Sequence, residues 1–301
     1  MKTFISLSKR NIKLFFRDKG LFFTSLITPM ILMVLYITFL GNVYRDSFIS
    51  ALPEGVNIPE KLLSGLVGGQ LVSSLLAVSC VTVAFCSNML MVQDKISGAR
   101  SDFSITPLPS SILSAGYYIS SLFSTLLICL AAAAVGFIYL SNVGWYLTAN
   151  DVISLIADIF LLAMFGTALS SIINLFMTSQ GQISAVGTII SAGYGFICGA
   201  YMPISQFGEG LQTVLSFLPG TYGTALVRSH SMRSALGELS SLGIPEDVVK
   251  TLKDVFDCNI YFGDTLVSEK AMYAILCGTV ILLLALYIFL SALVGKRKKK
   301  Q

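Results

Sequence analysis

The chain has 301 residues, of which 54% are hydrophobic and 12% are charged, and its formal net charge is +4. Its mean hydropathy of +0.79 lies well outside the usual mix of soluble domains, so the composition excludes a soluble globular protein and indicates a membrane protein. The excess positive charge gathers at the two chain ends, beside apolar segments, where it normally reflects topology or lipid contact, so no role in binding nucleic acid is expected.

Six long apolar runs follow one another along the chain and predict six transmembrane helices. Each run reaches the ~20 residues that a helix needs to cross ~30 Å of hydrocarbon. Inside lipid, every backbone N–H and C=O group must find a partner within the protein, which favours helices over loops and open strands. The expected fold class is therefore an all-α polytopic membrane protein. The runs cover residues 21–41, 62–92, 111–140, 152–177, 183–204 and 271–294.

The segment before the first run is amphipathic and basic. Between residues 2 and 19, apolar side chains alternate at roughly helical spacing with cations such as Lys9, Arg10 and Lys13. This pattern fits a helix that lies in the headgroup plane, although a simple positively charged anchor has the same composition. Basic residues gather again in the tail, at 296–300. The positive-inside rule therefore places both termini in the cytoplasm.

The polar segments between the runs fit this topology. Residues 93–110 carry Lys95 and Arg100 and fall on the cytoplasmic side, whereas residues 204–270 carry more acids than bases and fall outside. Residues 42–61 contain two prolines and are expected to form a polar external loop. Both termini and one short basic segment thus lie on one side of the membrane, and an enlarged acidic segment lies on the other.

The stretch from Asp94 to Pro107 is the most informative of the short segments. It combines balanced charges, a glycine and a Thr-Pro stop, the composition of a short exposed helix ended by proline. Such a helix would present Ile96, Phe103 and Ile105 for insertion into the groove of a partner. An ordinary solvated loop has a similar composition, so the residues alone leave both interpretations open.

Asp158 is the one acid within an apolar run. A carboxylate in hydrocarbon is costly and often marks a transport path or ion site. Asp151 and Trp145 place Asp158 near the membrane surface, which favours solvation or a hydrogen bond to a neighbour over a path residue. Asn88 and Asn174 also lie within apolar runs. Such side chains either line a path or join helices through hydrogen bonds, and joining helices is the ordinary role.

Candidate catalytic, cofactor-binding and metal-binding residues are not found. The six cysteines lack CxxC spacing, and only Cys258 is expected outside the apolar runs. The single histidine, His230, has no neighbouring ligand pattern and is expected at the surface. The chain contains neither GxGxxG nor GxxxxGK[ST], so no nucleotide phosphate cradle is predicted on it and no enzymatic activity is expected.

Two groups of residues make the chain resemble the permease subunits of ABC-2 type exporters. Gly98 followed by Thr106, Pro107 and Leu108 is similar to the cytoplasmic element of that family, and Pro203, Pro219 and Tyr222 are similar to its outer element. The resemblance extends over nearly the whole chain. It implies a single transmembrane domain of residues 1–301, with a connecting helix at 1–20, a coupling helix region at 94–108 and an external loop at 204–270 that contains short re-entrant helices.

The resemblance also implies a function and a set of partners. The chain would be the permease of an ATP-driven exporter in the plasma membrane, forming the substrate path with a second copy or a paralogue. A separate ATP-binding cassette subunit would hold ATP and Mg. The implied residues are Asp94, Lys95, Gly98, Arg100, Phe103, Ile105, Thr106 and Pro107 for coupling, Pro203, Pro219 and Tyr222 for the outer gate, and Asn88, Asp158 and Asn174 for the path.

A second class of function stays open at this stage. An ion-gradient-driven secondary transporter or channel would use Asp158 as its proton or cation site. Such transporters usually contain inverted repeats with broken helices in both halves, and no convincing repeat is found in this sequence. The absence of a second acid within the apolar runs also weighs against this class.

Overall fold

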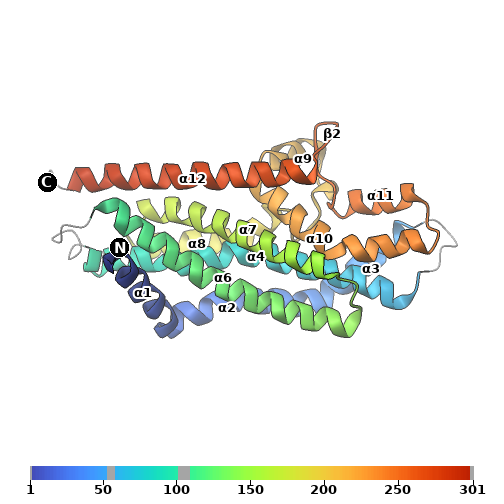
Figure 1. Cartoon of the computed structure of the whole chain (residues 1–301), viewed down its shortest axis with the longest axis horizontal. Coiled ribbons are helices and arrows are strands. Elements are labelled where there is room, and N and C mark those ends of the chain that lie inside the picture. The colour runs from blue at the N-terminus through green and yellow to red at the C-terminus, as the bar shows by residue number, and fades with distance from the viewer. Residues whose placement is uncertain (1, 53–57, 101–108, 299–301) are drawn as a thin grey trace.

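A computed structural model of the chain describes residues 2–52, 58–100 and 109–298 and is almost wholly helical (Figure 1). The short strands β1 (Tyr261–Phe262) and β2 (Thr265–Leu266) form an antiparallel hairpin. The helices are α1 (Lys2–Arg17), α2 (Lys19–Leu35), the π-helix η1 (Tyr36–Leu40), α3 (Gly41–Ser50), α4 (Glu60–Ile96), α6 (Ser110–Val143), α7 (Ala149–Phe176), α8 (Gln180–Ile197), the 3-10 helix η2 (Ile204–Gln206), α9 (Glu209–Ser216), α10 (Pro219–Ser241), α11 (Glu246–Val255) and α12 (Glu269–Lys298).

In the part of the chain that the structure describes, five helical stretches are long and apolar enough to cross a membrane. They are Lys19–Ser50, which joins α2, η1 and α3, then α4, α6, α7 and the stretch Glu269–Val294 of α12. These stretches confirm an all-α polytopic membrane protein. The remaining predicted run, at 183–204, forms the 18-residue helix α8, which is not among them.

The long helices run side by side along the longest axis of the molecule (Figure 1). Both termini, α1 and the last turns of α4 and α12 lie at one end, called here the basic end (Figure 1). The opposite end, called the loop end, carries α11 and the second half of α10 (Figure 1). Charged and polar connections are thus divided between the two ends of an apolar bundle.

Helix α4 is the axis of the bundle. Within its most apolar stretch 94% of the residues are buried, and it packs against α2, α6, α7, α8 and α10. The close approach of neighbouring segments to α4 requires glycine at two positions. A Cβ atom at Gly65 would lie 2.8 Å from the Tyr146 ring, and one at Gly69 would lie 2.9 Å from the Ser231 carbonyl oxygen. Small residues that let helix backbones approach are the usual device of packing in membranes.

Two predicted loops contain more helix than expected. Residues 42–61 were predicted to form an external loop, but α3 continues the first apolar helix through a π-helical turn as far as Ser50. In the segment 204–270, α10 has 23 residues and is largely buried. It runs antiparallel to α7. Near the start of α10, Gly223 packs against Leu162, midway along α7, where a Cβ atom on the glycine would lie 2.6 Å from the leucine side chain. Further along α10, Arg233 binds Asp151 at the start of α7.

Candidate functional site

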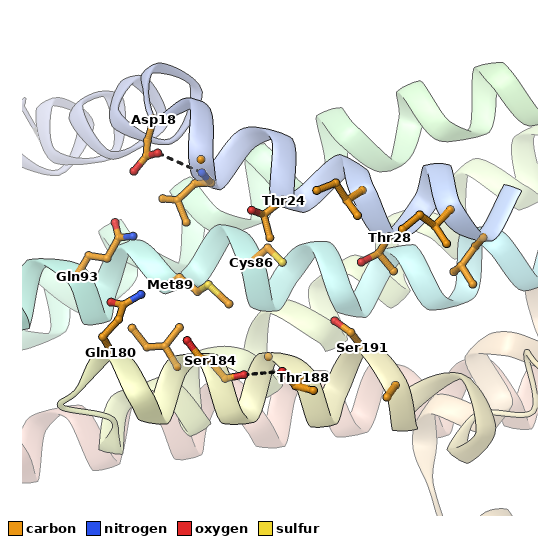
Figure 2. A pocket seen from close by; sticks show the side chains of 18 of the residues that line it. Asp18, Thr24, Thr28, Cys86, Met89, Gln93, Gln180, Ser184, Thr188 and Ser191 are labelled. Atoms are coloured by element: carbon orange, nitrogen blue, oxygen red, sulfur yellow. Dashed lines mark hydrogen bonds between the residues drawn. The ribbon is translucent and has the colours of Figure 1, made fainter. Parts of the chain in front are cut away.

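A groove with a volume of about 780 Å³ lies between α2 and α8, with α4 as its floor (Figure 2). Side chains of α2 and α8 face each other across α4 (Figure 2). Much of α2 and α8 is exposed beyond the groove, including Phe23, Met30 and Ile189. The groove therefore lies on a face of the bundle that the described part of the chain leaves uncovered.

The lining of the groove combines uncharged polar groups with apolar ones. Its one ionisable carboxylate, Asp18, caps the start of α2, where Oδ1 accepts a hydrogen bond from the Leu21 N–H at 3.1 Å. The labelled polar lining residues are Thr24, Thr28, Gln93, Gln180, Ser184, Thr188 and Ser191 (Figure 2). The groove thus offers mainly uncharged hydrogen-bonding groups, with one carboxylate at the start of α2.

The predicted path residue Asn88 joins helices and is absent from the lining of the groove. Its side chain is fully buried, its amide nitrogen donates to the hydroxyls of Ser170 at 3.1 Å and Ser171 at 2.8 Å, and its oxygen accepts from Ser121 at 3.2 Å. These contacts connect α4 with α6 and α7. Asn174 is also buried and lies outside the groove.

Asp158 lies in a buried hydrogen-bonded cluster with His230. The Asp158 carboxylate is 2.6 Å from His230 Nδ1 and accepts from the Tyr273 hydroxyl at 2.5 Å, while His230 Nε2 lies 3.1 Å from Glu269. The expectation of a surface histidine was wrong, because His230 is 1% exposed. Since both ring nitrogens face carboxylates, the geometry fits the doubly protonated imidazolium. Helices α7, α10 and α12 meet at this cluster.

The cluster predicts that the stability of the protein depends on pH. The two carboxylates raise the pKa of His230 and outweigh burial, which lowers it. The contribution to stability is therefore complete below the unfolded pKa of ~6.5 and is lost as the pH rises through the higher folded pKa. The midpoint of thermal unfolding in detergent should fall by a few degrees between about pH 6 and pH 9. Because His230 is the only histidine, the variant His230→Gln should lose this dependence.

Two further ion pairs fix α10. Arg228 is buried and lies 3.3 Å from the Asp257 carboxylate, while its second nitrogen donates to the Gly199 carbonyl at 2.6 Å. Asp257 in turn accepts from the backbone N–H groups at the start of η2. Burial raises the pKa of Asp257, and Arg228 opposes that rise. One turn beyond His230, Arg233 binds Asp151 at 2.7 Å.

The residues predicted for the outer gate define corners of the chain. Pro203 precedes η2, and Pro219 is the first residue of α10. The buried Tyr222 donates to the Ser216 carbonyl at 2.5 Å and so closes the corner between α9 and α10. Gly199 ends the α8 turn with a φ of +74°, in the left-handed region where glycine is favoured. Cys258, which lies outside the apolar runs as expected, is buried, and burial raises the pKa of its thiol to about 12.

At the basic end, the first predicted coupling residues face into the bundle. Asp94, 5% exposed on the last turn of α4, accepts from Arg10 at 2.6 and 3.0 Å and from the Tyr117 hydroxyl at 2.6 Å. This hydrogen bonding raises the pKa of Arg10. The Lys95 ammonium group donates to three carbonyls at the end of α7, among them that of Leu175 at 2.6 Å. Asp94 and Lys95 therefore tie α4 to α1, α6 and α7.

The remaining predicted coupling residues follow the end of α4. Gly98 has a φ of +83°, and no atom lies within 4 Å of the position of a Cβ there, which fits a glycine that ends a helix. Arg100 is half-buried. Phe103, Ile105, Thr106 and Pro107 lie outside the residues that the structure describes.

The sequence missed the polar groups of α10, although one signal for them exists. Asp151 and Asp158 are seven residues apart and so share one face of α7, while His230 and Arg233 are three apart and share one face of α10. When α7 and α10 pack in antiparallel order, each acid on α7 therefore meets one of the basic residues on α10. The pairing itself joins positions 72 and 82 residues apart, which a single sequence does not connect.

An apolar bundle of long helices with polar junctions at both ends defines a multi-pass membrane protein. The family model for the ABC-2 type transporter matches residues 2–230, about three quarters of the chain, and the chain therefore belongs to the ABC-2 type transporter family. The membrane domain of this family is the transmembrane component of an ABC transporter and is not itself the ATPase. A search among curated proteins gave no match.

Proposed function

We propose that the chain is the permease subunit of an ATP-driven exporter, and that two permeases enclose the substrate path between them. The groove on the uncovered face of α2, α4 and α8 carries this proposal. One permease provides only one wall of a path at this face, and a twofold assembly would supply the other. The second permease is either an identical copy or a paralogue.

Helix α8 supports assembly through this face. A Cβ atom at Gly181 or Gly193 of this helix would meet no atom within 4 Å. Small side chains without a packed neighbour leave room for close approach of a helix from another chain. The mainly uncharged, mixed lining of the groove favours an amphipathic cargo.

The proposed topology has six spans in the plasma membrane and both termini in the cytoplasm. Helix α8 would be the fifth span, entering at Gln180 beside the end of α7. Segment 204–270 would be external, with α9 and the first half of α10 re-entering the outer leaflet. The basic residues at both chain ends support this orientation through the positive-inside rule.

Energy for transport would come from a separate ATP-binding cassette subunit, which holds ATP and Mg. Residues 94–108 would be the coupling region that docks onto this subunit, with α1 as the connecting helix beside it. Movement of the docked region would be transmitted as a rigid-body shift, because Asp94 fastens α4 to α1 and α6, and Lys95 fastens it to α7.

Purification of the chain with its ATP-binding subunit tests the proposal. The chain is co-expressed with a candidate ATP-binding subunit, and the purified complex should contain equal numbers of permease and ATPase subunits, with two of each. Nucleotide-dependent transport in sealed vesicles should then require both proteins. Full transport by the isolated chain, driven by an ion gradient and independent of ATP, would overturn the proposal.

Replacement of Phe103 or Ile105 by Asp should abolish permease-stimulated ATP hydrolysis and leave membrane insertion intact. Both are apolar residues of the predicted coupling region, and a carboxylate placed in an apolar docking groove carries a desolvation cost of several kcal/mol. The ATPase rate of the reconstituted complex measures the effect. Leu242→Asp, at an exposed site near the end of α10, provides the matched control and should leave the rate unchanged. Normal stimulation in both coupling-region variants would rule out this docking segment.

A further inference from the structure

A second crevice lies at the basic end, where α1, α6 and α12 meet. Its volume is about 490 Å³, and apolar side chains form nearly all of its walls. The lining residues are Phe4, Ile5, Ser111, Ile112, Ala115 and Ile288. Ile5, one of its lining residues, is 57% exposed, so the crevice is open to the surface, and its apolar lining suits a hydrocarbon chain.

A row of cations continues from the edge of this crevice along α1. Ile5, Lys9 and Lys13 are spaced four residues apart and therefore share one face of the helix, and both lysines are exposed. The described residues give neither lysine an ion pair. Helix α1 contains no acid at all.

The opposite face of α1 packs against the helix bundle. Arg10 binds Asp94. Leu7 packs against Gly116 of α6 so closely that a Cβ atom at Gly116 would lie 2.6 Å from the Leu7 side chain. This packing holds α1 in place, so Lys9 and Lys13 stand at a fixed position beside the apolar crevice. An apolar slot from which two cations continue along one helix face is complementary to an acyl chain that carries an anionic headgroup.

We propose that this crevice, with Lys9 and Lys13, is a binding site for one anionic phospholipid. An acyl chain lies between α1, α6 and α12, and the phosphate headgroup contacts the two lysines. Basic pockets between transmembrane helices are known to recognise anionic headgroups in this manner. The lipid would complete the contact between α1 and α12, and the site is separate from the groove between α2 and α8.

The bundle contains a crevice of similar size that lacks these cations and serves as a control. It lies between α7 and α8, has a volume of about 460 Å³ and is lined by Ile173, Phe176, Met177, Gln182, Ala185 and Val186. The cation near it, Lys95, donates to carbonyls at the end of α7. This second crevice should accept acyl chains without preference for the charge of the headgroup.

Quenching of a single tryptophan by brominated lipids tests the proposal on the full chain. Trp145 is the only tryptophan, so Trp145→Phe gives a background to which Ile5→Trp or Phe176→Trp is added. Each protein is placed in phosphatidylcholine nanodiscs that contain a minor fraction of dibrominated phosphatidylglycerol or dibrominated phosphatidylcholine. The ratio of the two quenching efficiencies measures the headgroup preference beside the reporter.

At Ile5→Trp, the anionic lipid should be preferred by at least several-fold, since one cation near the surface corresponds to roughly five-fold. The preference should vanish when Lys9 and Lys13 are both replaced by Gln. It should remain when the two lysines of α11, Lys250 and Lys253, are replaced instead. At Phe176→Trp the ratio should stay near one. Equal quenching by the two lipids at Ile5→Trp, or a preference that persists without Lys9 and Lys13, would overturn the proposal. Lys9 and Lys13 are exposed, so their replacement leaves the packing of α1 unchanged.

Discussion

Replacing Asp94 by Asn is expected to release α1 from the bundle and to uncouple ATP hydrolysis from transport. The Asp94 carboxylate is buried and holds Arg10 through two hydrogen bonds and Tyr117 through a third. Hydrogen bonds to charged groups contribute about 1.5–3 kcal/mol, and the partial exposure of Arg10 places the loss near 2 kcal/mol. At 1.4 kcal/mol for each factor of ten, the ratio of docked to undocked α1 should fall about 30-fold.

Hydrogen exchange in α1 and the rate of transport measure these two consequences. The double variant Arg10→Gln with Asp94→Asn should be no worse than Asp94→Asn, because residues that share one interaction do not contribute additively. Arg45 and Glu60 form a matched control at the other end of α4, where a second Arg–carboxylate pair is largely exposed. Removing that pair should change stability little, because solvent screens an exposed ion pair. Equal effects at both ends of α4 would contradict a special role for Asp94.

The sequence was sufficient for the parts of the fold that depend on local pattern. Apolar runs of sufficient length predicted all five of the helical stretches that can cross a membrane, because burial of the backbone in hydrocarbon leaves little choice of structure. The same reasoning gave the amphipathic helix α1, in which a buried Leu7 and Phe15 alternate with exposed lysines. These features follow from residues that are close in sequence.

The part that failed depends on pairs of distant residues. Arg228, His230 and Arg233 give α10 a composition typical of an exposed loop, yet each charge is matched by an acid on another element. In a buried ion pair, the partner charge takes the place of the water that would hydrate each group. The polarity of a residue in the sequence therefore does not show whether its side chain is buried. For the same reason the sequence placed Asp94 in an exposed coupling helix, although its side chain faces Arg10 and Tyr117.

The position of these pairs has a consequence for mechanism. Asp94 and Lys95 fasten α4 at the basic end, while His230 and Arg233 fasten α10 to α7 at the loop end. Between them lies α7, which both groups contact. In the proposed mechanism, a shift received at the basic end would reach α10 through this one helix.

Replacement of Arg228 by Met should be the most destabilising of the changes considered. It leaves the Asp257 carboxylate buried without its cation and removes the donor to the Gly199 carbonyl. Loss of one partner from a buried pair costs about 3–5 kcal/mol. At about 2–4 °C for each kcal/mol in a protein larger than 150 residues, the midpoint of thermal unfolding in detergent should fall by roughly 10 °C.

Two comparisons separate the loss of a buried charge from a general effect on α10. Arg233 lies on the same helix and binds Asp151, but its side chain is 39% exposed, so Arg233→Met should lower the midpoint by only a few degrees. Adding Asp257→Asn to Arg228→Met should restore part of the stability, because it removes the unpaired buried charge. If Arg233→Met were as damaging as Arg228→Met, burial of the Arg228–Asp257 pair would not be what holds the corner between α8 and α10.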